Sequence, residues 1–262
     1  MQIPVISRKR LQSRICNYLD REQFKTRSSD EIKEIITTYL GASAFEKIKG
    51  AIITYGQGEM SPPEFYNHMA QRVDTSSVAE LFSGRSRKGI EWDMMKIAQE
   101  IREGHKTLLD LGCGQGLITC FIAAENPKLE ITGIDYSPLS IERAIERARK
   151  YGLQNTSFKV DNLENTMRDE NQYGIILCCH SIAEDNEHPN FINRRIGMLE
   201  QCIAPGGKLI VVTNEDVLTT EREGEPRKTK KRLVPKGQYT HQELIFREIK
   251  ALNKEVIHIW RK

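Results

Sequence analysis

The sequence lacks long apolar segments and paired cysteine motifs. None of its hydrophobic runs approaches the roughly 20 residues that a membrane-spanning helix needs. The six cysteines show no CxxC spacing and no pairing with a cluster of histidines, which argues against a zinc site or a disulfide framework. We therefore expect reduced thiols, no metal and no membrane association, as in a cytoplasmic protein.

An excess of charge of one sign is also missing. The 262 residues contain 39 Lys and Arg against 36 Asp and Glu, a net charge of +3, so the surface is not a general polyanion-binding coat. Basic residues do outnumber acids between residues 221 and 236, a segment that we interpret as an exposed loop. The segment could contact the phosphates of a nucleic acid, but no aromatic residue that could stack on bases lies among its charges from Arg222 to Arg232. A solvated insertion is the interpretation that we favour.

The hydrophobic pattern divides the chain near residue 104. Before that point apolar residues recur at helical spacing, and we expect residues 1–104 to form a helical cap or lid. The helices predicted there cover about 28–40, 42–55, 62–73 and 90–101.

From residue 105 to residue 262 short β-rich runs alternate with helical segments, which predicts an α/β core. The predicted strands are 107–111, 130–134, 157–160, 173–179, 208–213 and 256–260. The predicted helices are 116–125, 138–151, 163–169, 189–203 and 240–252. This alternation is typical of a doubly wound, mostly parallel Rossmann-like sheet with helices on both faces.

The most informative segment follows the first of these strands. Gly112, Gly114 and Gly116 alternate in the sequence DLGCGQG, between the strand and the next helix. Glycines permit a sharp turn and a close approach by a ligand, while the start of the helix offers free amides to an anion. The spacing is GxGxG, so it departs from the GxGxxG dinucleotide pattern.

Acidic residues end the next two predicted strands. Asp135 lies 19 residues after Gly116, where a carboxylate can accept hydrogen bonds from both hydroxyls of a ribose. Asp161 and Asn162 end the third strand, in a position suited to the edge of an adenine. Together with the glycines, these positions predict a nucleoside-containing ligand at the carboxyl ends of the strands.

Over residues 88–213 the sequence resembles the class I S-adenosylmethionine-dependent methyltransferases of small-molecule type. Asp110 to Gly116 match the first motif of that family, Asp135 the second, and Asp161 with Asn162 the third. Tyr173 to Asp185 resembles the fourth motif, and Ala204 to Leu209 matches the turn into the fifth strand. The resemblance implies S-adenosyl-L-methionine as cofactor, bound by Asp110, Gly112, Cys113, Gly114, Gly116, Asp135, Tyr136, Asp161, Asn162, Leu163 and Cys178.

The end of the sequence is where we expect a departure from that family. The family usually finishes with a helix, a sixth strand and an antiparallel seventh strand inserted beside it. We predict a helix at 240–252 and a single strand at 256–260, so that the seventh strand is missing or displaced.

Methyl transfer from a sulfonium is an in-line displacement that needs alignment and exclusion of water more than acid–base help. If the acceptor must lose a proton, His180 and Glu184 after the fourth strand are the candidate bases, although Glu184 also suits a helix start. Candidate substrate-pocket residues in the N-terminal region are Tyr66, His68, Met69 and Trp92.

We therefore expect a methyltransferase that acts on a small or medium-sized organic acceptor. Two alternatives remain: an RNA or protein methyltransferase that uses the basic segment 222–236, and a non-catalytic scaffold with the same fold. The sequence lacks the Asn-Pro-Pro-Tyr motif of amino-group methyltransferases and the Pro-Cys nucleophile of RNA cytosine-5 enzymes. Both absences argue against methyl transfer by those two mechanisms.

Overall fold

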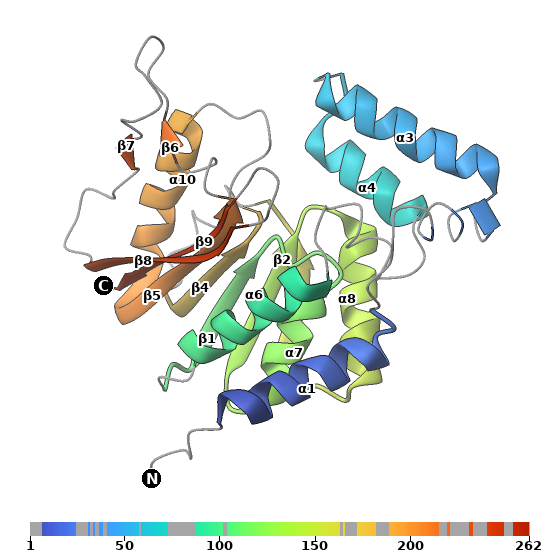
Figure 1. The fold of residues 1–262 in the computed structure, drawn as a ribbon. Helices are drawn as coiled ribbons and strands as arrows, with labels where there is room; N and C mark the ends of the chain where they lie inside the picture. The colour runs from blue at the N-terminus through green and yellow to red at the C-terminus, as the bar shows by residue number, and fades with distance from the viewer. Residues whose placement is uncertain are drawn as a thin grey trace. The chain divides into compact units, whose positions relative to one another are not determined.

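The structure is a computed structural model (Figure 1). It describes residues 7–24, 31, 34, 37–38, 41–57, 59–72, 87–101, 104–162, 165, 172–181, 189–214, 219–220, 231–232, 240–248 and 254–261. The chain forms two compact units. Unit 1 comprises residues 1–103 and 137–143, and unit 2 comprises residues 104–136 and 144–262.

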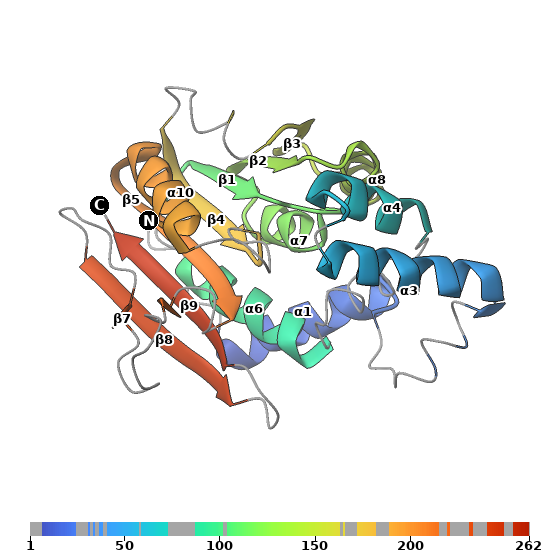
Figure 2. The ribbon, with the colours of Figure 1, turned by 90° about the horizontal axis from the view of Figure 1, so that it is seen from above.

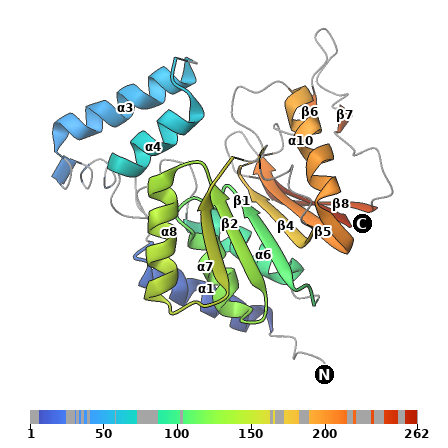
Figure 3. The same cartoon turned by 180° about the vertical axis from the view of Figure 1, so that it is seen from behind.

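Unit 1 is built from helices that associate in pairs. Helix α1 (Arg8–Arg21) packs with α6 (Arg87–Glu100), and α3 (Ala42–Gly56) packs with α4 (Pro62–Arg72), as Figure 3 shows for the second pair. Helices α3, α4 and α6 were predicted from their apolar spacing. Of the helix predicted at 28–40, the structure describes only residues 31, 34, 37 and 38, which are helical.

Helix α1 was not predicted, because basic residues dominate its sequence. Its apolar residues nevertheless recur at helical spacing, and Leu11, Ile15, Tyr18 and Leu19 are all buried. Ser7 caps the first turn by accepting a hydrogen bond from the backbone N–H of Arg10. The buried stripe, rather than helix propensity, therefore holds α1 in place.

Arg87 joins α1 to α6 through several hydrogen bonds. Its guanidinium donates to Asp20 Oδ1 at 2.6 Å, to the carbonyl oxygen of Phe24 at 2.5 Å and to Glu91 Oε1 at 2.8 Å. Only 15% of the Arg87 side chain is exposed, so these partners replace the water that it loses.

Unit 2 contains a seven-stranded sheet in the order β3-β2-β1-β4-β5-β9-β8. Its first five strands pair in parallel. They are β1 (Thr107–Leu111), β2 (Glu130–Asp135), β3 (Thr156–Val160), β4 (Tyr173–Cys179) and β5 (Ile203–Asn214). All five match predicted strands, and the predicted Rossmann-like class is confirmed.

The last two strands correct the prediction for the end of the chain. Of the helix predicted at 240–252 the structure describes residues 240–248, and these form a strand instead: β8 (Thr240–Glu248) pairs antiparallel with β9 (Lys254–Arg261), which in turn pairs antiparallel with β5. The seventh strand is therefore present, inserted between the fifth and the sixth. The segment THQELIFRE suits a helix by composition, but its pairing with β9, which shifts register between Ile245 and Arg247, decides its conformation.

Two other predictions fall largely outside the described residues. Of the helix predicted at 163–169 only Asn165 is described. Within the basic segment 221–236 only β7 (Lys231–Arg232) is described, paired antiparallel with β6 (Thr219–Thr220).

Helices cover both faces of the parallel strands, as Figure 2 shows for α7 (Leu117–Glu125) and α10 (Pro189–Gln201). Alternation along β1 explains the two layers, because neighbouring side chains on a strand point to opposite faces. Leu109 and Leu111 cluster with Ile196 of α10, whereas Asp110 between them bonds to α7. The site loops described below leave the carboxyl ends of these strands. None of the described helices has the length and apolar content to span a bilayer.

Candidate functional site

The loop between β1 and α7 is tied to the neighbouring strand by its backbone. The N–H groups of Gly112 and Cys113 both donate to the carbonyl oxygen of Ile134, at 2.8 and 2.9 Å. Gly116 then caps α7 with a φ of 72°, a left-handed conformation that glycine adopts without steric cost. The loop is therefore held at both ends, with its middle at Gly114.

The three glycines of this loop have different surroundings. A Cβ added to Gly112 would overlap the Cβ of Ser181, and one added to Gly116 would lie 2.9 Å from the Cβ of Ala144. A Cβ added to Gly114 would meet nothing within 4 Å, although the φ of Gly114 is also positive at 52°. Gly112 and Gly116 are thus needed for packing, while Gly114 faces open space that a ligand can occupy.

Asp135 at the end of β2 lies against this open position. Its Oδ2 accepts a hydrogen bond from the N–H of Gly114 at 2.9 Å, which joins the first and second motifs directly. A carboxylate offers about four lone-pair sites, so one bond to an amide leaves acceptor capacity for hydroxyl groups. This arrangement fits a ribose next to Gly114.

The predicted adenine-side residues follow β3. The backbone N–H of Asp161 donates to the carbonyl oxygen of Asp135 at 3.0 Å, which places the third motif beside the second. The Asp161 carboxylate accepts from the N–H of Asn162 at 2.9 Å and lies 3.2 Å from Lys159 Nζ. The side chain of Asn162 in turn accepts from the N–H of Asn165, at 2.7 Å. Leu163 lies outside the described residues.

Asp110 and Cys178 are buried in the site, and Cys113 is partly buried. Thr119 Oγ1 donates to Asp110 Oδ2 at 2.5 Å, and this bond holds the first turns of α7 against β1. Burial raises the pKa of the Cys113 thiol well above its usual value, and the charges of Asp110 and Asp135 add to the increase. Burial also raises the pKa of Cys178. Both cysteines are therefore neutral, unreactive thiols at physiological pH.

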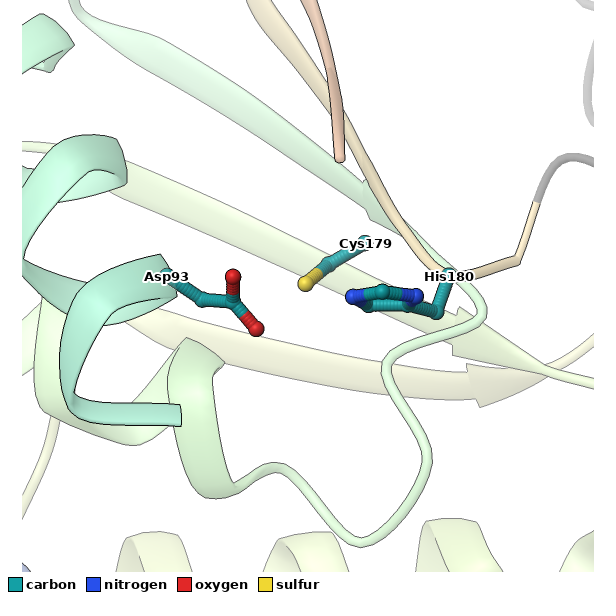
Figure 4. A group of neighbouring side chains, drawn as sticks. All are labelled: Asp93, Cys179 and His180. Atoms are coloured by element: carbon teal, nitrogen blue, oxygen red, sulfur yellow. The ribbon is translucent and has the colours of Figure 1, made fainter. Parts of the chain in front are cut away.

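His180 follows β4 with a strained backbone. Its φ is 55°, and a residue with a Cβ pays roughly 1–2 kcal/mol for this left-handed conformation. The conformation is held by a hydrogen bond from the His180 N–H to the carbonyl oxygen of Val212, at 2.8 Å, and by one from Ser181 Oγ to the carbonyl oxygen of Leu111. Figure 4 shows the side chains of Cys179 and His180 at this strand end; it also draws Asp93, which belongs to unit 1.

The remaining predicted site residues are Tyr136, Glu184 and four residues of unit 1. Tyr136, directly after Asp135, is partly buried, and Glu184 is outside the described residues. In unit 1, the ring of Tyr66 stacks edge-on against Phe65 at 5.2 Å, His68 is partly buried and Met69 is buried. Trp92 on α6 has Arg8 5.7 Å and Lys96 5.9 Å from its ring centroid. A substrate pocket formed by these four side chains stays a prediction.

The family of the chain follows from comparison with known proteins. A family model that describes a methyltransferase domain matches residues 102–260, more than half of the chain. The chain belongs to this methyltransferase family. The match covers β1 to β8 and all of β9 except its last residue, Arg261. It confirms the predicted class, and with it S-adenosylmethionine as the cofactor.

Individual relatives of this chain differ in what their names say they act on. A tRNA (guanine-N(7)-)-methyltransferase from Rubrobacter xylanophilus is 25% identical over 114 residues, which cover 41% of this chain and 51% of the relative. A ubiquinone biosynthesis O-methyltransferase from Coxiella burnetii is 32% identical over 117 residues, 45% of this chain and 47% of the relative. The chain thus spans about half the length of these curated relatives.

A solved structure shows the likeness of fold over a longer part of the chain. The structure of an O-methyltransferase family protein from Burkholderia thailandensis matches with a TM-score of 0.55 and 14% sequence identity. The match covers 86% of this chain and 72% of the other.

Sequence reasoning missed three side chains that hold the glycine loop. Ser181 packs against Gly112, Thr119 bonds to Asp110, and the guanidinium of Arg147 on α8 (Pro138–Lys150) donates to the carbonyl oxygen of Gln115. Arg147 is buried, which makes its bond to the loop a structural one. All three contacts join residues that are at least 9 positions apart, so no local pattern could have indicated them.

Proposed function

We propose that the protein is an enzyme that transfers a methyl group from S-adenosylmethionine to a small or medium-sized organic acceptor. The observation that carries the proposal is the open position at Gly114, bordered by the carboxylate of Asp135. A ligand with a ribose matches both features, because it needs close approach to the backbone and a hydrogen-bond acceptor for its hydroxyls.

Each part of the cofactor has candidate partners in unit 2. Asp135 would accept from the ribose hydroxyls, and Asp161 with Asn162 would contact the adenine edge. The N-terminus of α7 and the backbone around Gly114 would face the methionine part. When bound, S-adenosylmethionine supplies a methyl group on a positively charged sulfur, so the protein needs to align the acceptor and exclude water.

His180 is our candidate for a general base when the acceptor is a hydroxyl group. Strained backbone conformations concentrate at functional sites, and His180 has one at the strand end where the first motif also lies. An imidazole nitrogen within hydrogen-bond reach of a hydroxyl acceptor can remove its proton. Glu184 remains a second candidate from the sequence.

Binding of S-adenosylhomocysteine, the expected product, tests the cofactor assignment by isothermal titration calorimetry. We expect the wild-type chain to bind it, and Asp135→Ala and Gly114→Val to lose at least about tenfold in affinity, or about 1.4 kcal/mol. Lys128→Ala is a matched control, because this exposed side chain of unit 2 lies away from the loop sequence. A wild-type chain that does not bind S-adenosylhomocysteine refutes the proposal.

The role of His180 can be tested separately by the rate of methyl transfer. His180→Gly relieves the backbone strain and removes the imidazole. We expect it to retain cofactor affinity, to be about 1 kcal/mol more stable, and to lower kcat by about 10²- to 10⁴-fold. An unchanged kcat would show that His180 is not the base.

An RNA or protein acceptor is the second candidate. Curated relatives include a protein named as a tRNA methyltransferase, and the basic segment 222–236 is the part of the sequence that first suggested it. Replacing Lys228, Lys230, Lys231 and Arg232 with glutamine should then abolish salt-dependent RNA binding. A protein that binds S-adenosylhomocysteine but methylates no acceptor would instead fit the scaffold alternative.

A cytoplasmic location is part of the proposal. All six cysteines are free thiols, which fits a reducing compartment.

A further inference from the structure

A buried arginine contacts the second half of the glycine loop. Arg147 lies in the part of α8 that belongs to unit 2, and only 7% of the residue is exposed. Its guanidinium donates to the backbone carbonyl oxygen of Gln115, the residue between Gly114 and Gly116. Burying a guanidinium costs desolvation free energy, which its hydrogen bonds must offset. The direction of the Gln115 carbonyl group is therefore tied to α8.

Helix α8 also packs directly on the loop one residue further along. A Cβ added to Gly116 would lie 2.9 Å from the Cβ of Ala144, which precedes Arg147 by three residues. Residues three apart lie on the same face of a helix, so Ala144 and Arg147 approach the loop from one side. The close packing at Gly116 and the hydrogen bond at Gln115 together hold this half of the loop against α8.

The peptide group between Gln115 and Gly116 is hydrogen-bonded at both of its polar atoms. Its carbonyl oxygen accepts from Arg147, and its N–H donates to the carbonyl oxygen of Cys113 at 3.0 Å. The C=O and the N–H of a planar trans peptide point in opposite directions, so a single orientation makes both bonds. Rotation of this peptide would break both bonds and leave polar atoms without these partners in a partly buried loop.

The two halves of the loop are thus set by different side chains. The N–H of Gly114 donates to the carboxylate of Asp135, our candidate acceptor for the ribose, whereas Arg147 sets the peptide that follows. That peptide leads into α7, whose N-cap is Gly116, so no side chain caps the first amides of the helix. Uncapped amides at the positive end of a helix dipole suit an anion. The carboxylate of its methionine part is the single anionic group of S-adenosylmethionine.

We propose that Arg147 is a positioning residue, which orients the Gln115–Gly116 half of the loop for the carboxylate of the cofactor. The inference rests on the proposed function and deepens it, because it assigns a residue to one end of the cofactor. Arg147 acts through the peptide group that it holds. Holding this group before the cofactor arrives lowers the cost of ordering the loop on binding. The ribose end depends on Asp135 instead, so loss of Arg147 should affect the two ends of the cofactor unequally.

Two ligands that differ at the amino-acid end test this proposal. S-Adenosylhomocysteine and 5′-methylthioadenosine share the adenosine and a neutral sulfur, but a methyl group replaces the amino-acid chain in the second. Isothermal titration calorimetry gives the Kd of each ligand for wild type and for Arg147→Met, whose apolar side chain cannot donate to Gln115. We expect this variant to lose at least about tenfold in affinity for S-adenosylhomocysteine and less than about twofold for methylthioadenosine.

The ratio of the two Kd values is the deciding measurement. A smaller fraction of folded protein weakens the apparent binding of both ligands by the same factor, so it leaves the ratio unchanged. Arg149→Met is the matched control, because it removes an exposed arginine from the same helix, and its ratio should equal that of wild type. Arg147→Lys replaces the planar fork of donors with one ammonium, so its ratio should shift in the same direction but less. This variant decides the test if Arg147→Met does not fold.

The outcomes separate a failure of this proposal from a failure of the proposed function. Wild-type protein that binds neither ligand refutes the proposed function itself. If wild type binds both ligands and the Arg147 variants keep its ratio of Kd values, Arg147 only stabilises the fold and the positioning role is wrong. Wild-type protein that binds the two ligands equally also overturns the role, because its loop would then gain nothing from the carboxylate.

Discussion

The contrast between Gly112 and Gly114 gives the sharpest prediction, because alanine at the two positions should damage different properties. Both have positive φ, so alanine costs about 1–2 kcal/mol at either from backbone strain alone. At Gly112 the new methyl group also overlaps Ser181, and such overpacking adds about 1–3 kcal/mol. At Gly114 the methyl group meets no protein atom within 4 Å, so it projects into the space assigned to the cofactor.

Thermal unfolding and calorimetric titration with S-adenosylhomocysteine separate these effects. A loss of 1 kcal/mol lowers the Tm of a chain of this size by about 2–4 °C, so Gly114→Ala should lower it by about 2–8 °C and Gly112→Ala by about 4–20 °C. Gly114→Ala should nevertheless lose at least about tenfold in affinity, about 1.4 kcal/mol. If Gly114→Ala binds like wild type, or is less stable than Gly112→Ala, the assignment of the open position to the cofactor is wrong.

Two further predictions concern a thiol and an arginine. The pKa of the Cys113 thiol is raised in the folded protein, so above the ordinary cysteine pKa of about 9 the unfolded chain ionises first and the folded state loses stability. The Tm of the wild-type protein should therefore fall more between about pH 8 and pH 10.5 than the Tm of Cys113→Ser. Equal falls in Tm would mean that burial of this thiol is not coupled to folding. Arg87→Leu should lower the free energy of unfolding by about 1–3 kcal/mol, because it removes hydrogen bonds to charged groups and to a carbonyl oxygen. The stability of Arg87→Lys should lie between those of wild type and Arg87→Leu. A melting temperature of Arg87→Leu within error of wild type would show that this arginine does not hold α1 to α6.

The elements that could be predicted are those whose conformation is decided by their own sequence. Strands β1 and β4 were identified because each is a short apolar run, and strands buried on both faces have that composition. Strand β3 lies at the edge of the sheet and has no buried residue, so its β-rich composition alone identified it. Strand β8 was taken for a helix because its partner β9 lies beyond it in the chain and decides its conformation by pairing. Helix α1 was missed for a different reason: five of its 14 residues are basic, and they obscured the buried residues that recur at helical spacing.

The residues of the candidate site could likewise be predicted only in part. The glycines and Asp135 were found because their chemistry requires particular residue types at strand ends, whatever the rest of the fold does. The distinction between Gly114 and its neighbours could not be predicted, since it depends on what faces each Cα in three dimensions. Ser181 faces Gly112 from the end of β4, and only the parallel pairing of β4 with β1 brings the two together.

That pairing has a consequence for how the site works. Ser181 contacts Gly112 and bonds to Leu111, while the residue before it is the strained His180. The loop assigned to the cofactor and the turn that carries the candidate base are therefore held by one serine, and neither can change conformation without affecting this contact. A cofactor that orders the loop should consequently also order His180, so the base would be positioned for transfer when the methyl donor is bound.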